Sequence, residues 1–296
     1  MAGRGVAAAS GMRQRGDAPM TLEADSSGAL EWEGHLLLLY RSEAERRSQL
    51  AAWARRGLER DEKMIYAQDD TGPPQRSVLA VLAQQGIDAE AVTASGQLQV
   101  LPPAAVYGAG FGGQVTLINR ALAEGYSGVR TSGEVSTGPT VATPEEVYAG
   151  LDRHLEQLCG SYPLSVLCQC DLTSTVGRRL DRATANHLAG LRESQLQTAE
   201  CDGALILAGE VDLSNEMVLL SIIHAATSSA AMRTPSESFA VDLRRLTFLS
   251  VGGCRALAVG SQQFRDRGGC VLLMAPQWIV ERVLQLFGLD TRVRVE

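Results

Sequence analysis

Residues 239–257 read FAVDLRRLTFLSVGGCRAL, and this stretch decides the fold of the chain. Apolar residues dominate as far as Leu243, which predicts a buried strand, and a short loop then leads into a helix that starts at Val251-Gly252. Ser250 stands directly before that helix. Because the free N–H groups and the dipole of a helix N-terminus favour negative charge, a phosphate would be stabilised there. The stretch therefore predicts a strand–loop–helix unit with a hydroxyl at its turn.

In form, this unit resembles the phosphorylatable loop of STAS domains, the family of anti-sigma-factor antagonists. That family has Asp-Ser-Ser-Gly or Asp-Val-Ala-Gly where this chain has Ser-Val-Gly-Gly at residues 250–253. A second segment, GEVDL at residues 209–213, is similar to the Gly-Glu-(Leu/Ile/Val)-Asp-Leu signature of the family. The resemblance covers residues 194–296.

The resemblance implies docking to an anti-sigma factor or a related kinase-like switch protein. The residues assigned to this contact lie at the end of one strand, in the loop and in the first turn of the next helix: Asp212, Ser214, Thr247, Ser250, Val251 and Gly252. In related domains a kinase-type partner phosphorylates the loop serine, and the added charge breaks docking. Here the acceptor position falls on Gly252, which leaves Ser250 as the phosphorylation candidate. We favour a constitutive or differently controlled binder over a Ser250 switch.

The rest of the second half completes a small α/β pattern. Asp202-Gly203 is a hairpin signal between strands at 194–198 and 203–211. The remaining predicted elements are helices at 214–232, 251–267 and 277–287 and strands at 238–243, 270–275 and 291–295.

The first half opens with a continuous apolar run at residues 35–40, which is typical of a central strand buried on both faces. Ser42 and Glu45 form a capping box, which predicts a helix over 44–59. The other predicted elements are strands at 63–68, 97–101, 126–133 and 163–171 and helices at 77–85, 113–124, 144–158 and 183–191. Strands that alternate with helices predict an α/β fold, with a mostly parallel sheet and helices on both faces.

Three ordered segments of this half resemble the MEDS domain, the sensory domain of a dichloromethane-responsive regulator. They are HLLLLYRSEAE at 35–45, similar to His-x-Cys-x-x-Tyr-x-x-x-x-Glu; GVRTSGE at 128–134, similar to Gly-x-Arg-x-x-Gly-Glu; and LCQCD at 167–171, similar to a late Cys-x-Tyr-Asp strand. Leu37 and Cys170 depart from these patterns, and His187 falls where the family often has a histidine. The resemblance spans residues 33–191 and implies a RecA/KaiC-like core that serves sensing.

Five side chains are candidates for binding a small molecule: His35, Tyr40, Glu45, Glu134 and Asp171. Open parallel sheets bind ligands at the carboxyl ends of their strands, where Tyr40, Glu134 and Asp171 are expected to gather. Tyr40 would stack on or hydrogen-bond the ligand, and Glu134 would bind a polar group or a cation. The alternative is a core tyrosine with satisfied hydrogen bonds, beside carboxylates that cap helices. His35 lies inside a strand and is expected to be a core histidine, so no metal site is predicted.

Length and composition predict two domains behind a tail. The tail, residues 1–30, is rich in Ala and Gly and is expected to be disordered; the sensory domain is predicted at 31–192 and the STAS-like domain at 193–296. A net charge of −7 provides no basic surface for nucleic acid, and no apolar run is long enough to span a bilayer. With no signal peptide evident, a cytoplasmic protein with six reduced cysteines is expected, and a homo-oligomer is compatible with the sequence.

Neither catalysis nor a cofactor is expected. The chain has a single lysine, Lys63, in a polar segment, so it has no Walker A loop. Residues 108–113 match Gly-x-Gly-x-x-Gly, but they lack the context of a dinucleotide site, and a flexible loop is favoured. One contrasting hypothesis is an enzyme, either a KaiC-like nucleotide hydrolase or a redox protein that uses Cys168 and Cys170. Another is a degenerate nucleotide- or small-ligand-binding sensor that acts as a transcriptional co-regulator.

Overall fold

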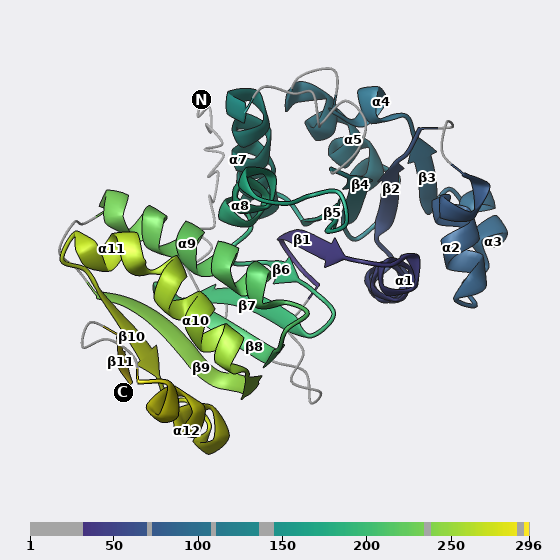
Figure 1. Ribbon diagram of the computed structural model, residues 1–296. Helices are drawn as coiled ribbons and strands as arrows, with labels where there is room; N and C mark the ends of the chain where they lie inside the picture. Colours follow the sequence, from purple (N-terminus) through teal and green to yellow (C-terminus); the bar gives the residue numbers. More distant parts are fainter. Residues whose placement is uncertain are drawn as a thin grey trace, which may run out of the picture.

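The structure, a computed structural model, describes residues 32–69, 73–107, 111–135, 145–233, 238–288 and 293–295. The predicted tail at 1–30 and the first part of the glycine-rich segment, residues 108–110, lie outside the described residues. Eleven strands form one sheet in the order β11-β10-β9-β8-β7-β6-β1-β5-β4-β2-β3 (Figure 1). Only the pairs β6–β7 and β7–β8 are antiparallel among them, so the predicted α/β fold with a mostly parallel sheet is confirmed.

The N-terminal half holds one end of this sheet. Its strands are β1 (His35–Tyr40), β2 (Lys63–Ala67), β3 (Leu98–Leu101), β4 (Val129–Glu134) and β5 (Leu164–Asp171). Its helices are α1 (Glu43–Glu59), α2 (Val78–Gln84), α3 (Ala89–Ala94), α4 (Pro103–Tyr107), α5 (Phe111–Ala123), α7 (Glu145–Ser161) and α8 (Arg178–Ala185), with a 3-10 turn at Pro74–Arg76. The capping box forms, but its second hydrogen bond is displaced by one residue. The Ser42 hydroxyl accepts from the Glu45 N–H at 3.2 Å, and the Glu45 carboxylate accepts from the N–H of Arg41, at 2.8 Å, and not from that of Ser42.

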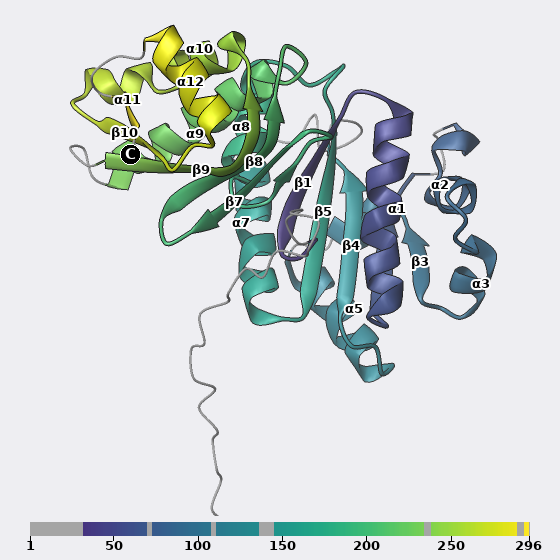
Figure 2. The same ribbon diagram turned by 90° about the horizontal axis from the view of Figure 1, so that it is seen from below.

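Alternation along β1 separates the two faces of the sheet. Leu36, Leu38 and Tyr40 pack under α1, α2 and α3, whereas Leu37 and Leu39 face α5, α7 and α8. All six residues of β1 are buried, as expected for a strand covered on both faces. Figure 2 shows α1 on one side of these strands. Neighbouring side chains of β1 therefore lie on opposite faces of the sheet, and each candidate residue of this strand belongs to one face or the other.

The C-terminal half continues the same sheet. Its strands are β6 (Leu191–Arg192), β7 (Leu196–Cys201), β8 (Ala204–Val211), β9 (Ser238–Leu249), β10 (Cys270–Met274) and β11 (Val293–Val295). Its helices are α9 (Glu216–Arg233), α10 (Val251–Gly260), α11 (Gln262–Asp266) and α12 (Trp278–Phe287). Asp202 and Gly203 both have positive φ between β7 and β8, which confirms the predicted hairpin. Figure 1 shows α9, α10 and α11 lying along this part of the sheet.

Three predicted elements differ most from the structure in their bounds. β9 extends to Leu249, so Thr247 lies in the strand and not in a loop, because β9 keeps pairing with β8 as far as Val211. The helix predicted over 183–191 ends at Ala185, after which turns at 186–190 lead into β6. The helix predicted over 251–267 divides at Ser261, whose hydroxyl bonds to the Leu257 carbonyl at 2.6 Å.

The two halves are joined by backbone hydrogen bonds as well as by the chain. β6 runs parallel to β1, with Leu37 opposite Leu191, and antiparallel to β7, with Arg192 opposite Gln197. On one face of the sheet, a single hydrophobic core continues from α5 through α8 and α9 to α12. Ser221 of α9 also donates to Asp181 of α8 at 2.6 Å. The division at residue 192 stays a prediction, while the structure makes the halves one continuous layer.

Gly209→Ala is expected to destabilise the fold by roughly 3 kcal/mol. Gly209 has φ +99°, and an added Cβ would lie 2.0 Å from the Gln195 carbonyl oxygen. Urea unfolding followed by circular dichroism measures the change. Gly252→Ala is the matched control, because its Cβ would meet only the tip of the Glu216 side chain, so its stability should stay within about 1 kcal/mol. Equal stability of the two variants would contradict the strain assigned to Gly209.

Candidate functional site

The carboxyl ends of β8 and β9 form a corner, which we define as residues 211–217 and 247–252 and call the β8/β9 corner. Val211 pairs with Leu249, and the Ser250 N–H donates to the Val211 carbonyl at 2.8 Å. The Asp212 carboxylate accepts from the Ser214 hydroxyl at 2.6 Å and from its N–H at 2.7 Å, and these bonds lower the pKa of Asp212. The structure therefore brings together the residues predicted to contact a partner.

Ser250 and Gly252 open helix α10. Ser250 is the N-cap, and its hydroxyl accepts from the Gly253 N–H at 3.0 Å. A Cβ on Gly252 would lie 1.7 Å from Oε2 of Glu216, so the Glu216 carboxylate occupies the space above the start of α10. Negative charge is favourable at that position of a helix. The N-terminus of α10 thus already has a carboxylate beside the residue where the resemblance places the phospho-acceptor.

Large apolar side chains are exposed at the same corner. Their exposed fractions are 83% for Leu213, 61% for Met217, 42% for Phe248 and 59% for Val251. Of these, only Val251 was among the predicted contact residues. The sequence could have pointed to Leu213, Met217 and Phe248. Each of them directly adjoins a polar residue, either in the two segments that resemble the STAS family or in helix α9. Exposed apolar groups gathered at one place are typical of an interaction surface.

A second polar site lies at the carboxyl ends of β1 and β4, and we call it the β1/β4 edge. The Tyr40 hydroxyl donates to the Glu134 carboxylate and accepts from Nη2 of Arg76 at 2.9 Å. Arg76 also forms a 2.7 Å ion pair with Glu43 at the start of α1. Burial, and then the adjacent Glu134 charge, raise the pKa of Tyr40, so this hydroxyl keeps its proton. Sequence reasoning found Tyr40 and Glu134 but missed Arg76, which lies in a turn without any local motif.

Beneath this edge lies a buried polar network centred on Arg46, which is 3% exposed. Arg46 donates to the Gln169 amide oxygen and to the Tyr66 hydroxyl, both at 2.8 Å. The Gln169 amide nitrogen donates in turn to Tyr66 at 2.9 Å and to Ser132 at 2.8 Å. The network fills the space between α1 and the strand ends with satisfied hydrogen bonds, so it fixes the position of the β1/β4 edge.

The other predicted ligand residues lie apart from Tyr40 and Glu134 or have local partners. Glu45 caps α1, and Asp171 is opposite Tyr40 in register but accepts from the N–H and hydroxyl of Thr173 at 2.8 and 2.7 Å. His35 lies at the other end of β1 and on the opposite face of the sheet. One small cavity, lined by Val106, Gln114, Leu117, Ile118, Thr131, Leu155 and Leu164, contains none of the predicted residues.

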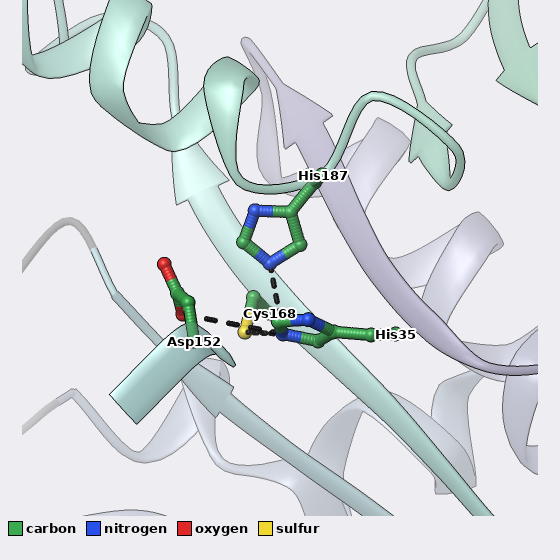
Figure 3. A group of neighbouring side chains, drawn as sticks. All are labelled: His35, Asp152, Cys168 and His187. Carbon is green, nitrogen blue, oxygen red and sulfur yellow. Dashed lines mark hydrogen bonds and ion pairs between the residues drawn. The ribbon is translucent and has the colours of Figure 1, made fainter. Parts of the chain in front are cut away.

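His35 belongs to a buried group with Asp152, Cys168 and His187 (Figure 3). Sequence reasoning treated it as a core histidine and did not foresee this grouping, because the four residues are scattered over more than half the chain. Burial raises the pKa of Cys168 well above its ordinary value and that of Cys170 to about 12. Without a metal ion, neither thiol therefore has the character of a reactive thiolate.

A contact between the two halves reaches the β8/β9 corner. Arg41 follows directly after Tyr40, and its guanidinium forms a 2.6 Å ion pair with Glu193 and donates to the Ser214 carbonyl. Glu193 is 1% exposed and also accepts from the N–H groups of Gln195 and Leu196 at 2.9 and 3.1 Å. Arg41, the chain neighbour of Tyr40 in the β1/β4 edge, thus supports the turn at the start of the β8/β9 corner.

Arg46→Ala is expected to lower the free energy of unfolding by about 3 kcal/mol, because it leaves buried Gln169 and Tyr66 groups with fewer partners. Arg47→Ala is the matched control from the next position, where the side chain bonds at the surface to Gln84 at 2.6 Å. Its cost should stay below about 1 kcal/mol. Chemical denaturation measures both, and an equal cost would show that the network does not stabilise this edge.

Family comparisons match both halves. A family model of the MEDS domain, described as the methanogen/methylotroph, DcmR sensory domain, matches residues 34–188, and a STAS domain model matches residues 173–296. A search of curated proteins found no match. Within the described ranges, every helix is too short or too polar to cross a bilayer. Because the first match covers more than half of the 296 residues, the chain belongs to the MEDS family, and it carries a STAS domain behind its MEDS domain.

Proposed function

We propose that this protein is a signalling protein in which the MEDS domain controls docking of the β8/β9 corner to an anti-sigma factor or a kinase-like switch protein. The observation that carries the proposal is the contact of Arg41 with Glu193 and with the Ser214 carbonyl. It connects the end of β1, where the predicted ligand site lies, to the turn of the predicted docking site. A STAS domain behind a MEDS sensory domain supports the same division of roles.

The hydrogen bonds around Glu193 explain how a change could pass between the sites. Its carboxylate accepts from Arg41 on one side and from the Asn215 amide at 3.3 Å on the other. The Asn215 side chain also accepts from the Asp212 N–H and donates to the Glu210 carbonyl, both at 3.0 Å. A ligand that displaces Tyr40 would move Arg41, its chain neighbour, and alter the support of this turn. Coupling of this kind requires contiguous contacts with two arrangements.

Control by the Arg41 contact fits the composition of the corner better than control by phosphate. The Glu216 carboxylate already lies over Gly252, and the Ser250 hydroxyl already caps α10. A partner that binds this corner therefore meets the Glu216 carboxylate even when no phosphate is present. We infer that regulation here comes from the position of the 211–216 turn.

We also propose that the chain does not catalyse a reaction. Lys63 lies at the amino end of β2, away from the carboxyl ends of the strands where a ligand would bind. Its ammonium pairs with Glu124. The turn after β1 brings Glu43 and Glu45 to the start of α1, where a nucleotide-binding fold would need to accept phosphate. Carboxylates at this position repel phosphate, which supports binding of a different class of ligand.

Leu213→Asp is expected to weaken binding of the partner at least about tenfold, since an apolar anchor in an interface is worth about 1.4 kcal/mol or more. The full-length chain would first be used to isolate an anti-sigma or kinase-like protein from the source cell, and the affinity of the purified pair would then be measured calorimetrically. Leu286→Asp is the matched control, because Leu286 is 71% exposed near the far end of α12.

Two outcomes would contradict the docking proposal, and a third would contradict the proposed mode of control. The first is that wild-type chain recovers no partner of this class, and the second is that Leu213→Asp and Leu286→Asp weaken binding equally. The third concerns control: loss of binding by Ser250→Asp would assign regulation to Ser250, whereas we expect this variant to keep its affinity because aspartate is also a good N-cap.

Glu193→Gln is expected to change partner affinity at least about fivefold, although the side chain is buried and cannot touch a partner. It is also expected to speed amide hydrogen exchange in residues 211–216, because the ion pair to Arg41 becomes a weaker hydrogen bond from the charged guanidinium to a neutral amide oxygen. Arg47→Ala provides the control, since its contacts lie wholly within the MEDS domain. Unchanged exchange and affinity in Glu193→Gln would refute control through this contact.

A further inference from the structure

Four side chains with metal-binding atoms meet inside the MEDS domain, and they come from four separate segments. His35 is on β1, Cys168 on β5, Asp152 on α7 and His187 in the connection between α8 and β6 (Figure 3). All four residues are buried, with exposed fractions of 6% or less. We propose that they form a zinc site, which is separate from the proposed docking function.

The distances are close to those of a tetrahedral zinc site. Zinc–ligand bonds of about 2.0–2.3 Å place neighbouring ligand atoms roughly 3.3–3.7 Å apart. Here Nε2 of His35 lies 3.0 Å from Nε2 of His187, 3.6 Å from Sγ of Cys168 and 4.0 Å from Oδ1 of Asp152. All four ligand atoms lie within 4.8 Å of one another, so small side-chain movements suffice to bind one ion.

The hydrogen bonds of the two histidines favour a cation between them. Nδ1 of His187 lies 2.8 Å from the Ala183 carbonyl, which can only accept, so Nδ1 carries the proton and the lone pair of Nε2 points at His35. If Nε2 of His35 carries a proton, then its Nδ1 lone pair faces the Glu156 carboxylate 3.5 Å away. If Nδ1 carries the proton, two Nε2 lone pairs face each other at 3.0 Å. Each neutral form leaves one repulsive contact, and a metal ion on Nε2 removes it.

The surrounding groups are arranged as a second shell of a metal site. The Ala183 carbonyl orients His187, and the Asn186 amide donates to Oδ2 of Asp152 at 2.7 Å, leaving Oδ1 toward the cluster. Nδ1 of His35 makes no hydrogen bond within the described residues, and the Glu156 carboxylate is placed to accept from it. Metal-bound histidines usually donate their second nitrogen to a carboxylate or a carbonyl in this way.

The donor set and its burial indicate the kind of metal and its role. Two imidazoles, one thiolate and one carboxylate suit Zn²⁺, whereas Mg²⁺ and Ca²⁺ prefer oxygen ligands alone. Four protein ligands in a closed site leave no position for a substrate, which is typical of structural zinc. The ion would bind β1 and β5 to α7 and to the segment that enters β6, and so would fix the junction between the two domains.

The test uses the full chain, stripped with a chelator and then loaded with Zn²⁺ or Co²⁺. We expect one bound metal per chain by elemental analysis, a rise in the unfolding temperature with Zn²⁺, and a thiolate-to-metal charge-transfer band with Co²⁺. Cys168→Ser should abolish that band and weaken binding at least about 100-fold, while Asn186→Ala should cost about 10- to 100-fold through the second shell. Cys170→Ser is the matched control, a buried cysteine two residues along the same strand, and it should bind as the wild type does.

Three results would overturn the proposal. They are wild-type chain that holds no metal after loading, an unfolding temperature that does not respond to Zn²⁺, and equal loss of the cobalt band in Cys168→Ser and Cys170→Ser. The first two are measured on the unaltered protein, so they decide the question even if a variant fails to fold.

Discussion

The buried carboxylate of Glu193 is the group on which the arrangement of the two domains depends. A charge at 1% exposure is costly unless it is paired and fully hydrogen-bonded. Its partners are supplied by both domains, Arg41 on one side and Asn215 on the other, with two backbone N–H groups at the start of β7. The bonds of Glu193 are satisfied only when the domains meet as observed. Their relative position is therefore specified by one polar centre as well as by the shared core.

Patterns within the chain were sufficient to predict much of the fold. The apolar run of β1, the capping box of α1 and the Asp202-Gly203 hairpin follow from local chemistry and were found where expected. The length of β9 could not be predicted in this way, because its last residues are held by pairing with β8, and an irregularity in that pairing leaves Thr247 and Phe248 both exposed. The continuous sheet was also hidden, since it depends on β6, a strand of only two residues.

The residues of the candidate sites could be predicted from the sequence only in part. Tyr40 and Glu134 could be brought together by reasoning, because both end parallel strands. His35 was also a candidate, although it was expected inside the strand as a core histidine, and alternation along β1 puts His35 and Tyr40 on opposite faces. Arg76 and Asp152 carry no motif, and only packing shows that they complete a site. Whether the β1/β4 edge binds a ligand stays a prediction.

The shared sheet has a consequence for how the two domains can exist. Its outermost described strands, β3 and β11, have four and three residues, and short edges resist pairing with other molecules. β1, in contrast, is six buried residues long. On one of its two sides, its only neighbour in the sheet is the short strand β6. A fragment that ended before β6 would uncover a long, flat, apolar rim, a template for aggregation. The C-terminal half thus covers an edge of the MEDS half, and separate expression of the MEDS half is expected to lower its solubility.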